Sequence, residues 1–232
     1  MISIRGLQVA YGKETVLNDL NLDLEEGKVH GLVGLNGSGK TTFLNVLYGL
    51  KEKRAGEVLD KGRKVGKPDI AYVEAENYFF PYITGKEYLD LFRNDAFPAS
   101  VWQQLFRLPL DKLVDSYSTG MKKKLAILGA LKTNKKIFLL DEPFNGLDME
   151  SAQVLKIVIR KLGENGHTLV VTSHLVEVLQ EVCDYVHYLK GGRVVRSYRA
   201  EEFGQMKTDL YGTFELRVRE QLDDLDWKGL EK

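Results

Sequence analysis

The sequence predicts an α/β fold built on a mostly parallel sheet with helices on both faces. Three observations indicate this fold class. Strand and helix patterns alternate along the chain between about residues 29 and 196. Residues 137–140 carry apolar side chains only, which is typical of a parallel strand buried on both faces. A glycine-rich loop at residues 34–42 connects a predicted strand to a predicted helix, as in many folds of this class.

Length and composition limit the possible functions. The 232 residues suffice for one well-buried domain, 1–232. Lys plus Arg and Asp plus Glu both number 33, so no net charge attracts nucleic acid, and we expect no such partner. The single cysteine, Cys183, excludes an intrachain disulfide and indicates a reducing compartment. No apolar run approaches about 18 residues and the first residues lack a signal-peptide pattern. We therefore expect a cytoplasmic chain without direct membrane insertion, held at a membrane only by another polypeptide.

The N-terminal part of the chain predicts strands. Apolar and polar side chains alternate along Ile2–Val9 and again along Leu20–Leu24, which predicts an antiparallel pair. Gly6 interrupts the first pattern and indicates a bulge. The apolar run Val29–Val33 predicts the strand that leads into the glycine-rich loop and the helix after it. Short strands are expected further on, at residues 57–59 and 70–73.

A small helical segment is predicted at about residues 76–118. Residues 72–106 hold 10 of the chain's 23 aromatic side chains. Thr84 and Glu87 form a capping-box pattern, which predicts a helix that runs to about Arg93. The aromatic side chains either pack the core of this segment or offer a surface to a partner, because interface cores are enriched in aromatic residues. The sequence favours neither interpretation.

The remaining elements follow from periodicity and turn residues. Apolar positions three or four residues apart between Met121 and Leu131 form the stripe of an amphipathic helix. Further elements are expected as helices 101–106, 154–162 and 175–182, strands 137–140 and 168–172, and a hairpin at 186–196. Residues 205–232 carry no recognisable motif and are expected to form a short C-terminal extension of unknown role.

The glycine-rich loop has the pattern of a phosphate-binding loop. Its glycines let successive N–H groups point into one concavity, and the N-terminus of the following helix adds partial positive charge. We expect Lys40 to reach the β- and γ-phosphates of a nucleoside triphosphate, and the Thr41 hydroxyl to ligate Mg²⁺. The expected nucleotide ligands in this loop are Gly34, Asn36, Gly37, Ser38, Gly39, Lys40, Thr41 and Thr42.

Two adjacent carboxylates follow the apolar strand 137–140. Asp141 is placed to hold the Mg²⁺ shell, and Glu142 to polarise the water that attacks the γ-phosphate. Adjacent carboxylates repel each other, and a bound Mg–ATP would offset that repulsion. His174 directly follows another predicted parallel strand, at the end where ligand groups collect. The other histidines have no such context and are expected to be structural: His30, His167 and His187.

Three lysines, Lys122, Lys123 and Lys124, lie in the first turn of a predicted helix. Cations there oppose the helix dipole, at a cost of roughly a few tenths of a kcal/mol each. Two interpretations stay open: either the three side chains are simply solvated, or the preceding turn faces an anion that restores the balance.

The order of these motifs resembles that of the ATP-binding subunits of ABC transporters over about residues 1–200. The phosphate loop matches the family's Walker A motif in full, and Ile137–Glu142 matches Walker B with the catalytic glutamate. Asn145–Asp148 is similar to the D-loop, which implies a place for Asp148 at the nucleotide site. His174 occupies the position of the switch histidine, and Tyr11 that of the aromatic residue that stacks on adenine. The resemblance implies a P-loop NTPase core with an antiparallel β subdomain and a small helical subdomain, the ABC ATPase type.

The segment 117–121 lies where the family signature Leu-Ser-Gly-Gly-Gln belongs. Ser118 and Gly120 match it, and three positions depart from it: Tyr117, Thr119 and Met121. In the family, this signature contacts the γ-phosphate of ATP bound to the opposite subunit. The resemblance therefore implies a head-to-tail dimer, a homodimer or one with a paralogous ATPase subunit, with two nucleotides between the subunits. It also implies transmembrane permease subunits as partners, with the aromatic segment 78–82 as the docking surface at the inner face of the membrane.

One departure concerns the family's Q-loop glutamine, whose position is occupied by Ala75. Alanine can neither ligate Mg²⁺ nor orient water. Glu74 and Glu76 flank it and offer carboxylates, although each adds negative charge near the γ-phosphate. The resemblance implies ATP hydrolysis that drives transport, with Glu142 and His174 as catalytic residues. Two alternatives stay open: a soluble ATPase of the same family with a non-transport task, and a weakly hydrolysing regulatory nucleotide-binding subunit.

Overall fold

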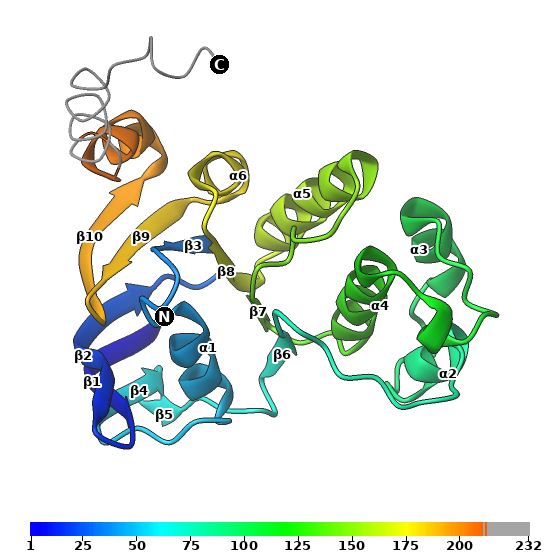
Figure 1. Cartoon of the computed structure of the whole chain (residues 1–232), viewed down its shortest axis with the longest axis horizontal. Helices are drawn as coiled ribbons and strands as arrows, with labels where there is room; N and C mark the ends of the chain where they lie inside the picture. Colours follow the sequence, from blue (N-terminus) through cyan, green and yellow to red (C-terminus); the bar gives the residue numbers. More distant parts are fainter. Residues whose placement is uncertain (211, 213–232) are drawn as a thin grey trace, which may run out of the picture.

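The computed structural model describes residues 1–210 and 212, which form two sheets with helices packed around them (Figure 1). The larger sheet has six strands in the order β10-β9-β3-β8-β7-β6. Every neighbouring pair is parallel except β9 with β10, so the predicted mostly parallel sheet is confirmed. The strands are β3 (Val29–Val33), β6 (Ile70–Val73), β7 (Ile137–Leu140), β8 (Thr168–Ser173), β9 (Tyr185–Lys190) and β10 (Arg193–Arg199).

The smaller sheet is antiparallel, with the strand order β2-β1-β4-β5. Its strands are β1 (Ile2–Tyr11), β2 (Glu14–Leu24), β4 (Ala55–Asp60) and β5 (Arg63–Lys64). The predicted bulge is confirmed: the register shifts between Ile4 and Leu7, and Gly6 has a φ of +58°. A Cβ at Gly56, on the paired strand, would overlap the Gly6 carbonyl oxygen, so the bulge needs glycine on both strands.

Most helices are separated from one another by strands, but four helical elements follow one another along the chain without a strand between them. Between β6 and α4 lie α2, α3 and η1, which with α4 form the right-hand part of the molecule in Figure 1. The helical elements are α1 (Lys40–Tyr48), α2 (Gly85–Asp90), α3 (Ala99–Phe106), η1 (Val114–Ser116), α4 (Thr119–Lys132), α5 (Met149–Glu164), α6 (Val176–Val182) and η2 (Ala200–Glu202). The capping box of Thr84 and Glu87 is present at the start of α2. No helix in the described part of the chain is both long and apolar enough to cross a membrane.

Helix α2 ends at Asp90, so the prediction that it runs to about Arg93 is wrong. After Asp90, the chain packs against α4 and does not form a further turn of α2. The Phe92 ring packs so closely on α4 that a Cβ on Gly129 would lie 2.7 Å from it. The Asn94 amide donates a hydrogen bond to the carbonyl of Lys132, the last residue of α4 (3.1 Å). Tertiary packing therefore decides where this helix stops.

The six-stranded sheet separates two hydrophobic clusters. Successive residues of β7 alternate between them: Ile137 and Leu139 belong to one cluster, Phe138 and Leu140 to the other. The first cluster also contains side chains from α1 and the small sheet, and the second contains side chains from α4, α5 and α6. The predicted burial of β7 on both faces and the cover of helices on both faces are confirmed.

The described part of the C-terminal extension packs onto the second cluster. Met206 is buried there, as is Phe203 just before the extension. Asp209 accepts hydrogen bonds from Arg196 (2.7 Å) and from the Tyr198 hydroxyl (2.9 Å) of β10. The rest of the extension predicted at 205–232, namely residue 211 and residues 213–232, lies outside the described residues.

His30 and His187 form a buried hydrogen-bonded pair, in keeping with a structural role. His30 Nε2 lies 3.0 Å from the carbonyl oxygen of Glu25 and must donate to it. With both rings neutral, His30 Nδ1 accepts from His187 Nε2 (3.1 Å), and His187 Nδ1 accepts from the Ser197 hydroxyl (2.8 Å). This series of bonds then assigns one tautomer to each neutral ring.

Protonation of this pair is expected to destabilise the fold at low pH. Burial lowers the pKa of His187 from 6.5 to about 3 and also lowers the pKa of His30. Between about pH 3 and pH 6.5, His187 binds a proton in the unfolded chain but not in the folded chain. The contribution of the neutral pair to the stability of the fold is therefore complete above pH 6.5 and decreases as the pH falls. At pH 5.5 the protonation of His187 in the unfolded chain lowers the free energy of unfolding by about 1.4 kcal/mol. Urea unfolding at pH 7.5 and 5.5 should show a smaller loss in His187→Gln; an equal loss in parent and variant would contradict the assignment.

Candidate functional site

The glycine-rich loop runs from the end of β3 to the start of α1. Gly37 and Gly39 have φ angles of +78° and +106°, which glycine adopts without strain. A Cβ on Gly39 would lie 2.7 Å from the Leu17 side chain, so the small sheet packs directly on the loop. The Phe43 N–H donates to the Gly39 carbonyl (2.8 Å). The N–H groups of residues 40–42 precede that bond and point outward from the helix N-terminus.

The loop contains a buried hydroxyl that lacks a partner. Ser38 Oγ is buried, and no group among the described residues forms a hydrogen bond with it. Gly34 lies so close that a Cβ there would be 2.6 Å from this oxygen. Asn36 is exposed at the tip of the loop, and Thr42 is buried. Because an unpaired buried hydroxyl is costly, a phosphate oxygen would stabilise this loop. The loop fits a polyphosphate.

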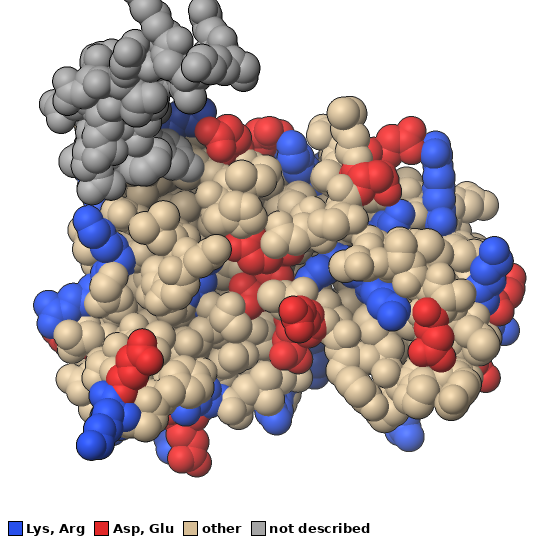
Figure 2. Space-filling view, viewed as in Figure 1, with Lys and Arg blue, Asp and Glu red and all other residues tan. Residues whose placement is uncertain are grey.

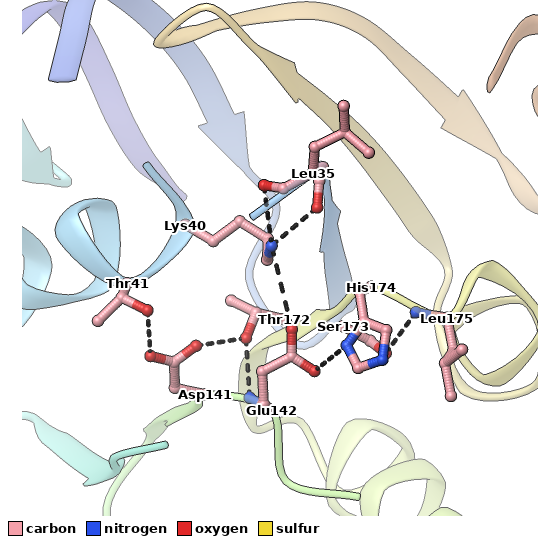
Figure 3. Close-up of polar contacts among 10 residues, drawn as sticks. Leu35, Lys40, Thr41, Asp141, Glu142, Thr172, Ser173, His174 and Leu175 are labelled. Atoms are coloured by element: carbon pink, nitrogen blue, oxygen red, sulfur yellow. Dashed lines mark hydrogen bonds and ion pairs between the residues drawn. The ribbon is translucent and has the colours of Figure 1, made fainter. Parts of the chain in front are cut away.

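Asp141 is fully buried at the end of β7 and accepts hydrogen bonds from two threonines (Figure 3). Thr41 Oγ1, at the start of α1, donates to Asp141 Oδ2 (2.7 Å). Thr172 Oγ1, near the end of β8, donates to Asp141 Oδ1 (2.6 Å). Carboxylate and hydroxyl oxygens are ligands that suit Mg²⁺. Thr41 and Asp141 bring two such oxygens together from different elements, as the sequence predicts.

Glu142 adopts a φ of +45°, which costs a non-glycine residue about 1–2 kcal/mol. Its N–H donates to Thr172 Oγ1 (2.8 Å), which holds this conformation. Its side chain, 14% exposed, lies between Lys40 and His174 (Figure 3). Oε1 is 4.0 Å from Lys40 Nζ, and Oε2 accepts a hydrogen bond from His174 Nδ1 (3.1 Å). The unusual backbone conformation therefore aims the carboxylate at the phosphate loop and at His174.

Lys40 completes this group. Its Nζ donates to the Gly34 carbonyl (2.8 Å), and the side chain is 8% exposed. Burial lowers the pKa of Lys40, while the charges of Glu142 and Asp141 favour its protonated form. The groups meet at the carboxyl ends of β3, β7 and β8, where parallel sheets bind ligands. This arrangement can bind a polyphosphate and hold a base beside it. We call it the carboxylate cluster: Lys40, Thr41, Asp141, Glu142, Thr172 and His174.

Ser118, Gly120 and Asp148 lie apart from the carboxylate cluster, at the N-termini of α4 and α5. Ser118 Oγ accepts a hydrogen bond from the N–H of Met121 in the first turn of α4 (3.3 Å). Asp148 accepts from Ser151 N–H and Oγ (2.8 Å each), which holds the pKa of Asp148 down at about 2. A Cβ on Gly120 would overlap the Gly146 carbonyl oxygen, so glycine lets the two helix starts approach each other. Within the described part of the chain, no hydrogen bond joins these side chains to the carboxylate cluster.

The three lysines at the start of α4 differ in their surroundings. Lys122 is partly exposed, whereas Lys123 and Lys124 are 3% and 7% exposed. The interpretation that all three are simply solvated is therefore wrong for two of them. Lys124 Nζ lies 3.0 Å from Ser151 Oγ at the start of α5. Lys123 donates to two main-chain carbonyls just after β6 (2.8 and 2.6 Å). Oxygen atoms of the protein, not water alone, surround these cations.

Tyr11 and Ala75 lie outside both groups. Tyr11 ends β1 and is 48% exposed, with Lys51 Nζ 4.0 Å from the centre of its ring. One face of the ring therefore carries a cation. Ala75 is exposed, as are Glu74 and Glu76 beside it. Neither carboxylate forms a hydrogen bond or ion pair with any described residue, so the structure does not bring them into the carboxylate cluster.

Two features of the site were not predicted from the sequence: Thr172 and the burial of Lys123. Thr172 does carry a signal: it directly follows the apolar run Leu169–Val171 of β8 and lies two positions before His174. Its pairing with Asp141 depends on the adjacent, in-register pairing of β7 and β8. The burial of Lys123 depends on a contact with a segment about 50 residues earlier, for which the local sequence has no signal.

Comparison with known proteins agrees with this geometry. The family model described as ABC transporter matches residues 17–145, more than half of the chain. The chain is 29% identical to the lantibiotic transport ATP-binding protein SrtF of Streptococcus pyogenes, over 84% of this chain and 89% of that protein. It is 28% identical to the ABC transporter ATP-binding protein YtrB of Bacillus subtilis, over 99% and 84% of the two chains.

Solved structures lead to the same family. The dimeric post-hydrolysis state of the ATP-binding cassette MJ0796, bound to ADP and Pi, superposes with a TM-score of 0.75 at 25% identity. The match covers 86% of this chain and 99% of that one. The two sheets and the helices of the present chain thus have the architecture of an ABC ATPase. The chain belongs to the ABC transporter family, as an ATP-binding subunit whose hydrolysis of ATP drives transport.

Proposed function

We propose that the carboxylate cluster is the hydrolytic site and assign a role to each side chain. Lys40 and the phosphate loop bind the β- and γ-phosphates, Glu142 takes the proton of the attacking water, and His174 orients Glu142 through their hydrogen bond. The observation that carries this proposal is the position of Glu142 between Lys40 and His174. A base held beside a phosphate-binding cation can activate a water molecule next to the γ-phosphate.

Thr41 and Asp141 are the residues that would hold Mg²⁺. Their oxygens lie 2.7 Å apart and suit a small, hard cation. An ion held by these two oxygens would neutralise charge on the β- and γ-phosphates. Thr172 keeps Asp141 in place by donating to its other oxygen, which leaves Oδ2 directed at Thr41. The buried Thr172 side chain thus fixes the orientation of the Asp141 carboxylate relative to Thr41.

We also propose that Ser118, Gly120 and Asp148 act on the nucleotide of a second subunit. They lie away from the chain's own carboxylate cluster, at the adjoining starts of α4 and α5. Two helix N-termini side by side favour an anion. A head-to-tail dimer, of two copies or with a paralogous subunit, would bring that pair to the γ-phosphate bound by the other subunit. The dimeric assembly of MJ0796 supports this arrangement.

Transport also requires a membrane partner, and we propose transmembrane permease subunits that dock on the aromatic segment 78–82. This segment belongs to the helical subdomain 76–118, an insertion in the single ATPase domain 1–232. Tyr78, Phe80 and Tyr82 are 76%, 54% and 83% exposed. Figure 2 shows mostly uncharged side chains along the lower edge of the molecule on the right, with single acidic and basic side chains among them. Aromatic side chains at this density are typical of interface cores. The chain would then be peripheral to the cytoplasmic face of the membrane.

Replacing two of the exposed rings tests the docking surface. Tyr78 and Phe80 pack edge to face, 5.6 Å apart, on the surface. Tyr78→Ala with Phe80→Ala should reduce co-purification with the permease subunits at least about tenfold and change the free energy of unfolding by less than about 0.5 kcal/mol. Ile157→Ala, an exposed side chain on α5, is the matched control. Undiminished co-purification of the double variant would exclude this surface.

Phe79 separates the two interpretations of the aromatic segment. Its ring is half-buried and packs against Tyr88 at 4.9 Å, so it belongs to the core of the helical segment. A joint replacement of Phe79 and Phe80 would confuse docking with stability. The core interpretation is therefore confirmed for Phe79, whereas its exposed neighbours Tyr78, Phe80 and Tyr82 remain the proposed docking surface.

A further inference from the structure

The ammonium group of Lys123 is an unusual feature of this structure. The side chain is 3% exposed, although lysine is almost never fully buried without a partner. Its Nζ donates to the main-chain carbonyls of Glu74 (2.8 Å) and Ala75 (2.6 Å). Both acceptors belong to the segment that leaves β6. A buried cation therefore joins the first turn of α4 to this segment.

Electrostatics explains why a charge is tolerated here. Burial lowers the pKa of Lys123, whereas the negative charges of Asp141, Glu142 and Glu76 favour its protonated form. Lys123 thus lies within the field of the two carboxylates at the end of β7. Two carbonyl oxygens accept hydrogen bonds from it, which offsets part of the cost of removing the ammonium group from water.

The segment held by Lys123 connects two parts of the molecule. At one end, the carbonyl of Val73 in β6 accepts a hydrogen bond from the N–H of Asp141 (2.9 Å). At the other end begins the exposed aromatic segment 78–82. Only residues 74–77 lie between the backbone that touches Asp141 and the surface on which a partner would dock. Lys123 holds the start of this connection against α4.

We propose that Lys123 is a positioning residue that holds residues 74 and 75 against α4, and so couples the aromatic segment 78–82 to the carboxylate cluster. The proposal rests on the function assigned to that cluster. Its acceptors are main-chain oxygens, so the coupling needs no particular side chain at position 75. This accounts for Ala75, which contributes its carbonyl group and not a side chain.

The neighbouring lysines provide a comparison within the same helix turn. Lys124 points toward α5, with Nζ 3.0 Å from Ser151 Oγ, and lies on a different side of α4. Lys122 is partly exposed and serves as the matched control. The two buried cations thus tie the start of α4 to two different neighbours. Among the hydrogen bonds of the described residues, Lys123 is the one of these three lysines that donates to the segment leading to the aromatic surface.

The test compares the full-length chain with Lys123→Met, Lys123→Arg and Lys122→Met. Methionine keeps the apolar stem and removes the donors. We expect kcat for ATP hydrolysis to fall about tenfold or more in Lys123→Met, with KM within about twofold of the parent, because the phosphate loop is untouched. Cleavage by chymotrypsin after Tyr78 and Tyr82, identified by mass spectrometry, should become at least about fivefold faster because the segment is released.

Arginine also donates to two carbonyls, so Lys123→Arg should restore both readouts, and Lys122→Met should match the parent. Unchanged cleavage at the aromatic segment in Lys123→Met would overturn the proposal, as would a fall in kcat that arginine does not restore. If Lys123→Met does not fold, Lys123→Leu, which also lacks hydrogen-bond donors, takes its place with the same expectations. Proteolysis does not depend on hydrolysis, so it reports on the coupling even if Glu142 is not the base.

Discussion

Replacement of Glu142 by glutamine is expected to lower the steady-state rate of ATP hydrolysis by about 100-fold or more, while ATP still binds. In the proposed mechanism the carboxylate is the base that takes the proton from water, and an amide cannot do so at neutral pH. The two side chains have the same shape. The main-chain bond from Glu142 N–H to Thr172 (2.8 Å) does not involve the changed group, and the amide oxygen can still accept from His174 Nδ1. The fold and the phosphate loop should therefore be unaffected.

The measurement is phosphate release by the purified chain with Mg²⁺ and ATP, with EDTA as the control for dependence on the metal. Size-exclusion chromatography with ATP should show Glu142→Gln as a dimer that persists, because the nucleotides between the subunits are not consumed. A variant that hydrolyses ATP like the parent and stays monomeric with ATP would show both the assigned base and the nucleotide-sandwich dimer to be wrong.

The phosphate loop and the two carboxylates could be predicted from the sequence because their chemistry is local. Residues 34–42 encode both the turn and the helix N-terminus, and Asp141 with Glu142 directly follows a strand recognisable by its apolar side chains. The antiparallel pair and the bulge at Gly6 were predictable for the same reason, since alternation and a single glycine are local signals.

Contacts between distant segments could not be predicted in this way. The local helix dipole gave no reason for Lys123 to be buried, because its two acceptors lie in a segment about 50 residues earlier. The end of α2 at Asp90 is set by side chains that pack on α4. The different burial of Phe79 and Phe80 could not be predicted for the same reason. The two residues are adjacent and both aromatic, and Phe79 belongs to the core because its ring packs against Tyr88.

Thr172→Val is expected to impair both stability and activity, since one buried hydroxyl contacts both Asp141 and Glu142. Thr172 Oγ1 accepts from Glu142 N–H (2.8 Å) and donates to Asp141 Oδ1 (2.6 Å), and the side chain is fully buried. Valine has nearly the same volume but leaves both groups without this partner. An unsatisfied buried group costs about 1–3 kcal/mol, so urea unfolding should show a loss of about 2–4 kcal/mol.

The same change should lower kcat by about 100-fold, because Asp141 and the backbone that aims Glu142 lose their support together. Thr172→Ser is the matched control: it keeps the hydroxyl and removes only a methyl group, so it should retain most of the activity. Valine as stable and as active as the parent would mean that β7 alone fixes the two carboxylates. Loss in valine with recovery in serine would place the origin of the site's geometry in β8, a strand that contributes no acid or base of its own.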